Sequence, residues 1–299
     1  MRRRMRRGLG LAEVVACLAI VGATALLIAM ALPRSRSSAR VATCRRNLMQ
    51  IGVATAVFAQ RADALPAVPP LGESGPSPLL TLLRGLGQGN FDDMADPAKP
   101  PPKRGTGPAG AGYLSGLTCP ADRSALSTFH PAPISYRAVA GPGPDGVGGP
   151  FAPGRSTTVA EVQGGDGAGH TLGFVERLVG GGSGGSKPRG AYRRVPGPVG
   201  DGPCAEGPML DDAGSSWAVA DWRSTLANHA LTPNAGPSCI AADGQTARIS
   251  ASSGHSGLAH GLLLDGSVRA FTDRIDPEVW RRWSTLRGSP RGAAPAPPT

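Results

Sequence analysis

Aromatic residues are scarce in this 299-residue chain, which has only six Phe, four Trp and three Tyr. Glycine and proline are abundant instead, with 44 and 30 residues, a share close to that of low-complexity chains. The stretches richest in them are expected to be loops or linkers, and they cover residues 65–78, 96–112, 141–154, 180–190 and 288–299. The composition therefore predicts a loop-rich molecule in which only short apolar segments form strands.

Charge is missing from residues 14–32, a run of 19 residues ended by Pro33. At about 1.5 Å per residue, a helix of this length spans roughly 28 Å, which is enough to cross the apolar core of a bilayer. A cleavable secretory signal is the alternative, because the small residues at 29–31 resemble a cleavage site, but its apolar region has only about 7 to 15 residues. We therefore expect a transmembrane segment at 9–32.

A basic face is also missing, although basic residues outnumber acidic ones by 31 to 21. Without the five arginines of residues 2–7, the count is 26 basic to 21 acidic residues. Five more arginines lie at 34–46, and without them and Glu13 the remainder is 21 to 20. The basic excess thus flanks the apolar run, and we expect no nucleic acid partner.

Complete patterns for catalysis or metal binding are absent as well. The GGSGG stretch at 181–185 fits the G-x-S-x-G pattern, but it does not follow a strand that leads into a helix, as a nucleophile elbow requires. No two cysteines have the C-x2-C spacing typical of zinc sites, and Asp166, Glu176 and Asp276 are not part of a complete Ca²⁺ loop. We expect no catalytic residue, no metal and no cofactor, and hence not an enzyme.

One carboxylate, Glu13, stands at the start of the apolar run, where a charge costs about 2.5 to 3.5 kcal/mol at the bilayer centre and less near the end. Cleavage after Gly8 would free the amine of Leu9 and make Glu13 the fifth residue. This arrangement resembles the N-terminus of type IV prepilins and pseudopilins. The resemblance implies cleavage by prepilin peptidase, methylation of the Leu9 amine, and pairing of Glu13 with the terminal amine of a neighbouring subunit. A buried carboxylate becomes tolerable once it gains such a cation.

The helical pattern continues after Pro33 as a stalk to residue 61. Side chains on one face recur at spacings of three and four: Val41, Cys44, Leu48, Ile51, Thr55 and Phe58. We expect this stripe to pack on the protein's own head, with packing on neighbouring subunits as the alternative. Pro33 is expected to kink the helix, because it removes a backbone hydrogen bond.

Short apolar segments predict the strands of the head, at 171–179, 247–253, 258–264 and 267–271. The last two flank Asp265 and Gly266, a dipeptide typical of a two-residue type I′ turn. Residues 276–278, Asp-Pro-Glu, then predict a helix start that carries Trp280 and Trp283 onto the sheet.

The fold class expected from these elements is α+β and pilin-like. A long N-terminal helix, first transmembrane and then stalk, leads into a loop-rich globular head with an antiparallel sheet. The segments expected are a cleaved leader at 1–8, a transmembrane helix at 9–32, a stalk helix at 33–61, a head at 62–287 and a disordered tail at 288–299.

His255 is followed, after nine residues, by Asp265 and Gly266. Together with the prepilin-like start, this H-x9-D-G ending resembles a large family of bacterial prepilin-like proteins of unknown function. The segments at 44–52, 118–124 and 159–177 resemble that family's Cys-bearing helix, its Cys-Pro-x-Asp loop and its segment ending in Glu-Arg. The resemblance covers the chain from end to end but implies no activity.

The histidine of this motif has two interpretations. His255 and Asp265 are candidates for a base and its orienting carboxylate, or for metal ligands together with His260. We favour a structural interpretation, in which Asp265 is a turn residue and His255 a partly buried hydrogen-bonding residue.

Cysteine usage is consistent with export. Cys17 lies within the apolar run, which leaves an even number of cysteines outside it, and an even number suits disulfides in the periplasm. Three pairings of Cys44, Cys119, Cys204 and Cys239 remain open on spacing alone. The family resemblance favours Cys44 with Cys119, because the family keeps both, and leaves Cys204 with Cys239.

Two classes of function follow. The first is a membrane-anchored pilin- or pseudopilin-like structural subunit, with prepilin peptidase, like subunits or a secretion or pilus assembly machinery as partners. The second is a membrane-anchored periplasmic binding protein or hydrolase that uses the prepilin signal only for placement. Five arginines lie on each side of the apolar run, so the positive-inside rule does not decide which side faces the cytoplasm. The resemblance therefore sets the orientation, single-pass in the bacterial inner membrane, with the leader in the cytoplasm and the head in the periplasm.

Overall fold

The computed structural model describes residues 10–73, 75–87, 112–125, 132–181 and 189–288, without the side chains of 27–34. The expected leader, the cleavage position at Gly8 and Leu9, and residues 289–299 of the expected tail lie outside the described residues. The chain divides into two compact units, residues 1–42 and 43–299, which are described separately below.

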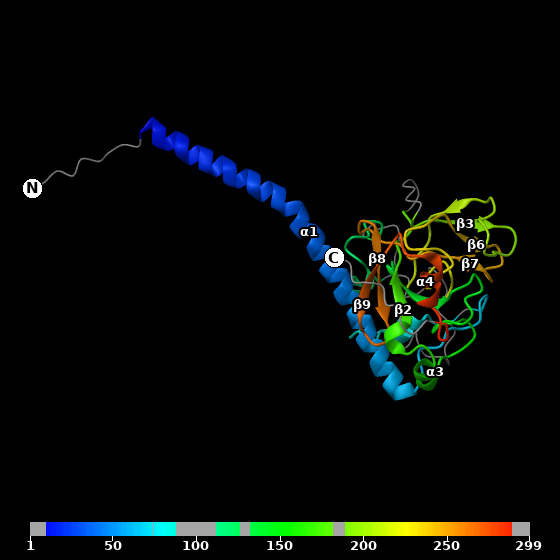
Figure 1. Ribbon diagram of the computed structural model, residues 1–299. Helices are drawn as coiled ribbons and strands as arrows, with labels where there is room; N and C mark the ends of the chain where they lie inside the picture. The colour runs from blue at the N-terminus through cyan, green and yellow to red at the C-terminus, as the bar shows by residue number, and fades with distance from the viewer. Residues whose placement is uncertain (1–9, 74, 88–111, 126–131, 182–188, 289–299) are drawn as a thin grey trace, which may run out of the picture. The chain divides into compact units, whose positions relative to one another are not determined.

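Helix α1 runs without interruption over Leu11–Ala62, so the backbone stays helical at Pro33 (Figure 1). The stem and stalk expected from the sequence are therefore one helix. Among the residues described, no helix has both the length and the apolar character that crossing a bilayer requires. The transmembrane segment expected at 9–32 does not meet this criterion, and the side chains of its residues 27–32 lie outside the description.

A five-stranded sheet forms the centre of the second unit. Its strands are β1 (Tyr136–Gly141), β2 (Leu172–Glu176), β5 (Leu226–Asn228), β8 (Leu258–Leu263) and β9 (Val268–Thr272), in the order β5-β1-β2-β8-β9. Three of the strand pairs are antiparallel, but β5 runs parallel to β1. The expected antiparallel sheet is thus a mixed one. Residues 142–225, which include β2, β3 and β4, bring the chain back so that β5 runs alongside β1 in the same direction.

A smaller four-stranded sheet has the order β4-β3-β6-β7 and is also mixed, because β3 and β6 are parallel. Its strands are β3 (Tyr192–Val195), β4 (Met209–Leu210), β6 (Ser238–Ala241) and β7 (Ala247–Arg248). The strand expected at 247–253 is therefore shorter than predicted, because only Ala247–Arg248 form β7. Two short helices precede β1, namely α2 (Pro78–Leu82) and η3 (Ser115–Leu117), and two lie between β1 and β2, namely α3 (Val159–Gly164) and η4 (Ala168–His170).

The helical stripe of the stalk packs on the head, as expected. Cys44, Leu48, Ile51 and Thr55 are buried, and the first three belong to the main core. The helix approaches the β8–β9 hairpin so closely that a Cβ on Gly52 would lie 2.9 Å from Leu262 Cδ1. A larger residue at this position would therefore force the Leu262 side chain to move.

The few aromatic residues are concentrated in the core. All four tryptophans are buried, and α4 (Pro277–Arg282) contributes Trp280 directly and Trp283 at its end. The sequence predicted the start of this helix correctly, because Asp276 Oδ1 accepts the backbone N–H groups of Glu278 and Val279. Trp280 in turn donates its indole N–H to the carbonyl of Leu231 at 2.8 Å.

A buried arginine links the two sheets. Arg177 directly follows β2, and its Nη1 donates to Ser238 Oγ in β6 at 3.1 Å and to the carbonyl of Ser250 at 2.8 Å. Burial lowers the pKa of Arg177 to about 10, so the guanidinium is still charged at neutral pH. The charge is thus used to hold the small sheet against the large one.

Candidate functional site

Glu13 lies in the first turn of α1 and has a partner within its own helix. Its Oε2 accepts the backbone N–H of Gly10 at 3.1 Å, and its own N–H donates to the Gly10 carbonyl at 3.0 Å. The carboxylate thus satisfies a backbone donor that a helix N-terminus leaves free. The sequence suggested only a neighbour's amine as partner and missed this local role.

The surface of α1 between Leu11 and Leu26 is apolar and exposed. Seven large apolar side chains between Leu11 and Leu26 are 42% to 82% exposed: Leu11, Val14, Val15, Leu18, Ile20, Val21 and Leu26. Cys17, a free cysteine, is exposed among them. Such a continuous apolar helix surface is typical of a segment that contacts lipid or another protein.

In the head, residues from several of the sequence motifs meet in one buried cluster. Glu176, at the end of β2, is 1% exposed. Its Oε2 accepts the backbone N–H of His260 at 2.8 Å and lies 3.0 Å from the ring Nδ1 of the same residue. Its Oε1 lies 3.5 Å from Nε2 of His255. The two histidine rings contact each other edge to face, with centroids 5.1 Å apart.

Glu176 is ionised in this setting. Burial alone raises the pKa of a carboxyl group, but the contacts with His255 and His260 outweigh it and hold the pKa of Glu176 at about 2. The 3.5 Å contact with His255 is too long for a hydrogen bond, and Oε1 has no hydrogen-bond partner among the described residues. One oxygen of a buried charge is thus left unsatisfied.

The first disulfide lies against this cluster. Cys44 from α1 and Cys119 from the loop after η3 are bonded, and Cys119 Sγ is 3.6 Å from His255 Nε2. In the sequence these residues belong to separate motifs, and nothing there identifies Glu176 as the carboxylate partner of His255. The nearest signal was the Glu-Arg ending of the segment at 159–177.

Asp122, from the Cys-Pro-x-Asp loop, fixes the loop that carries Cys119. It is buried, and its Oδ2 accepts the backbone N–H of Val179 at 2.8 Å and the hydroxyl of Ser135 at 2.9 Å. Burial raises the pKa of Asp122, although these hydrogen bonds oppose the shift. The loop thereby gains a defined position beside the main sheet.

Asp265 and Gly266 lie in the turn between β8 and β9, away from His255. The turn is not the expected two-residue type I′ turn, because only Gly266 has a positive φ, of 87°. Leu263 N donates to Ser267 O and Gly266 N to Leu263 O, which leaves a three-residue loop with glycine in the left-handed region. Asp265 Oδ1 accepts the backbone N–H of Ser267 at 2.8 Å. Asp265 is thus a turn residue and does not orient His255.

The remaining candidates are separate. Cys204 and Cys239 form the second disulfide, so the pairing that the resemblance favoured, Cys44 with Cys119, and the pairing left by default are both present. The three acids weighed for Ca²⁺ have different roles. Asp166 accepts the backbone N–H of Gly288, Glu176 belongs to the histidine cluster, and Asp276 caps α4.

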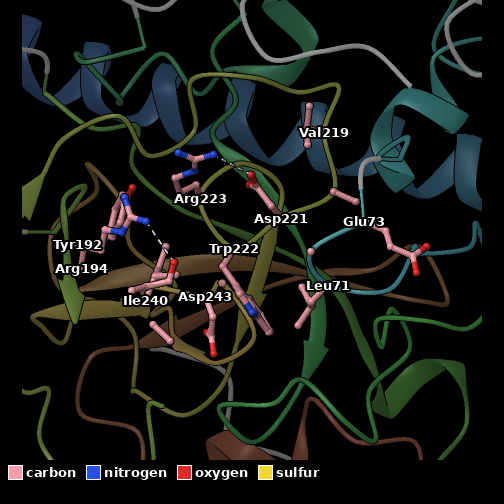
Figure 2. Close-up of a pocket in the computed structure, with 15 residues that line it drawn as sticks. Leu71, Glu73, Tyr192, Arg194, Val219, Asp221, Trp222, Arg223, Ile240 and Asp243 are labelled. Carbon is pink, nitrogen blue, oxygen red and sulfur yellow. Dashed lines mark hydrogen bonds and ion pairs between the residues drawn. The ribbon is translucent and has the colours of Figure 1, made fainter. Parts of the chain in front are cut away.

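A pocket of about 550 Å³ with a mixed apolar and charged lining lies beside the small sheet (Figure 2). Its wall is formed by β3 and β6 with the loops at 71–73 and 219–223, and Tyr192, Arg194 and Trp222 line it. Arg194 donates to the carbonyl of Ala242 at 3.2 Å, while Arg223 lies 3.6 Å from Asp221. Charges of both signs therefore surround a cavity of the size that holds small molecules.

Comparison with known families matches residues 33–278 to the family described as "Protein of unknown function (DUF1559)". No curated protein and no solved structure matches the chain. The match to the family extends over the stalk half of α1, both sheets, both disulfides and the buried histidine cluster. This chain therefore belongs to that family of proteins of unknown function.

Proposed function

We propose that the chain is a membrane-anchored, pilin- or pseudopilin-like structural subunit that assembles through the N-terminal part of α1. The observation that carries the proposal is the uncovered apolar surface between Leu11 and Leu26. A continuous apolar surface of this kind is unfavourable in water, and lipid together with neighbouring stems would cover it. The absence of charge from 14–32 in the sequence supports the same placement.

The prepilin-like spacing of Gly8, Leu9 and Glu13 supports processing by prepilin peptidase after Gly8. The same resemblance implies that the leader lies in the cytoplasm and the head in the periplasm. The two disulfides in the head support an oxidising compartment. The Gly10 N–H occupies only Oε2 of Glu13, and an ionised carboxylate has further acceptor sites. Glu13 is therefore able to cap its own helix and to accept the terminal amine of a neighbouring subunit.

Intact mass and N-terminal analysis of the membrane-extracted protein tests the processing step. From cells with active prepilin peptidase we expect a chain that begins at Leu9 and carries an N-methyl group. Cells that lack the peptidase should retain the leader. A mature N-terminus after Ala31, or an intact leader in peptidase-active cells, would contradict the proposal.

Crosslinking through Cys17 tests assembly. This thiol is free and exposed within the apolar surface, so a bismaleimide added to membranes should join neighbouring stems. We expect dimers and higher species, which disappear in a Cys17→Ser variant. A wild-type protein that stays monomeric at native expression levels would indicate a lone anchor.

A second function, that of a membrane-anchored periplasmic binding protein or hydrolase, is favoured by the pocket beside the small sheet. Its volume and mixed charges suit a small polar solute. A thermal-shift screen of charged solutes on the full chain separates the two functions. A solute that stabilises the wild type but not an Arg223→Ala variant would support binding. No stabilisation by any solute, together with Cys17 crosslinks, would support the structural subunit.

A further inference from the structure

Four side chains with metal-binding atoms surround one buried point in the head. The Sγ atoms of Cys44 and Cys119, one nitrogen of His255 and one oxygen of Glu176 all lie within 4.8 Å of one another. They come from α1, the loop after η3, the loop before β8 and the end of β2. We propose that reduction of the Cys44–Cys119 disulfide turns this cluster into a site for one Zn²⁺-like ion, held by both thiolates, the imidazole and the carboxylate.

The spacing of the cluster suits tetrahedral coordination. With Zn–S bonds of about 2.3 Å and Zn–N or Zn–O bonds of about 2.0 to 2.2 Å, neighbouring ligand atoms stand roughly 3.3 to 3.8 Å apart. The separation of Cys119 Sγ and His255 Nε2 is 3.6 Å, and that of His255 Nε2 and Glu176 Oε1 is 3.5 Å. The two bonded sulfurs have to move apart, and the remaining ligand atoms already lie within 4.8 Å of one another, so the site needs only small shifts to close around an ion.

The unsatisfied oxygen of Glu176 is a second, independent observation. Oε1 is buried, faces His255 and has no hydrogen-bond partner among the described residues, whereas Oε2 is held by His260. Metal-binding carboxylates and imidazoles are commonly oriented by such outer partners. The arrangement therefore leaves one carboxylate oxygen oriented and free to bind an ion.

The two states of the site differ by a balanced redox step. A dithiol or phosphine reductant supplies two electrons, the S–S bond breaks and each sulfur takes up one proton. The dithiol becomes a disulfide, or the phosphine becomes its oxide with oxygen from water. Metal binding then releases both thiol protons to solvent, because the thiolate is the ligand. Two thiolates and an imidazole favour Zn²⁺ or Co²⁺ over Ca²⁺ and Mg²⁺.

Co²⁺ is the probe that tests this site. The full chain in detergent is reduced with a phosphine, desalted under argon and titrated with Co²⁺. We expect one equivalent to bind, with a thiolate-to-metal charge-transfer band and the visible absorption of tetrahedral Co²⁺, and Zn²⁺ to displace it. The disulfide-bonded protein should bind none. Cys44→Ser and His255→Ala should abolish the tetrahedral spectrum, while His170→Ala, which removes an exposed histidine outside the cluster, should retain it.

Alkylation of the wild-type protein keeps the proposal testable if the variants fail to fold. In the reduced chain, Zn²⁺ should slow the modification of Cys44 and Cys119 by iodoacetamide at least tenfold, as read from their peptides by mass spectrometry, and should leave Cys17 unaffected. Equal rates with and without Zn²⁺ would overturn the proposal. So would a tetrahedral Co²⁺ spectrum that survives in Cys44→Ser, or a reduced chain that loses its tertiary circular dichroism and does not regain it with Zn²⁺.

Discussion

Glu176 holds His260 at two points, because its Oε2 accepts the His260 backbone N–H at 2.8 Å and lies 3.0 Å from the ring Nδ1. The two residues stand one step beyond the last β2–β8 pair, which joins Val175 and Gly261. The carboxylate therefore continues the strand pairing with a side chain where the backbone ladder ends. It also keeps its other oxygen directed at His255.

Removing the charge of Glu176 should destabilise the head. We expect Glu176→Gln to lower the free energy of unfolding by about 3 kcal/mol, because one partner of a buried charge cluster is lost. Glu206→Gln is the matched control, since Glu206 pairs with Arg193 at the surface, where such a pair contributes at most about 1 kcal/mol. Urea denaturation of the full chain in detergent measures both, and equal effects would contradict the assignment.

Stability should fall in mild acid because of His229. This residue is buried, stacks on Trp280 with ring centroids 3.7 Å apart and places Nδ1 2.8 Å from the Trp280 carbonyl. Burial lowers the pKa of His229 to about 3, against an opposing effect of that hydrogen bond. The unfolded chain takes up a proton near pH 6.5 and the folded chain does not. The stabilisation is therefore complete above about pH 6.5 and is lost as the pH falls toward 3.

The free energy of unfolding, measured between pH 7.5 and 4, should show this dependence. In His229→Gln, which keeps an N–H donor, the curve should be flatter over that range. The exposed His170, changed in the same way, should leave the slope as in the wild type. An unchanged slope in His229→Gln would mean that another group governs the acid sensitivity.

Gly266 should resist substitution for conformational reasons alone. Its φ is 87°, and an added Cβ would meet no atom within 4 Å. Gly266→Val should cost about 1 to 3 kcal/mol, because a β-branched residue is strained at positive φ. Gly200 has equally open surroundings without a positive φ, so Gly200→Val should change the melting temperature little. Similar losses in both variants would argue against strain.

Local signals explain what the sequence predicted correctly in the head. Asp276 and the residues after it start α4 because capping depends on neighbours in sequence. The buried stripe from Cys44 to Thr55 follows from helical periodicity. Both features are set by residues within a few positions of one another, and hence a single sequence is sufficient to recognise them.

Long-range features were not predictable in the same way. An apolar strand pattern does not specify which strand lies beside it, so the parallel pairs β1–β5 and β3–β6 could not be foreseen. The Asp265–Gly266 dipeptide fits both a two-residue and a three-residue turn. The contact between Glu176 and His260 joins residues 84 positions apart, and no local spacing encodes it.

For assembly, the negative charge of Glu13 should matter more than the hydrogen bond by which its side chain accepts the Gly10 N–H. Glu13→Gln keeps an oxygen that can accept the Gly10 N–H, whereas Glu13→Ala removes it. If the carboxylate pairs with a neighbour's amine, both variants should be inserted and cleaved normally but give fewer Cys17 crosslinks. Crosslinks that persist in Glu13→Gln and fall only in Glu13→Ala would point to the cap.

The Cys44–Cys119 bond also determines how the chain would carry a mechanical load. The bond closes a loop with a sequence separation of 75 residues, which includes the part of α1 after Cys44. A pull on the N-terminal end of α1 against a fixed C-terminal end would pass from Cys44 through the sulfurs to Cys119. The residues in between lie off that path. In the oxidised protein, tension therefore cannot unravel the end of the helix that packs on the head, whereas in the reduced protein it can.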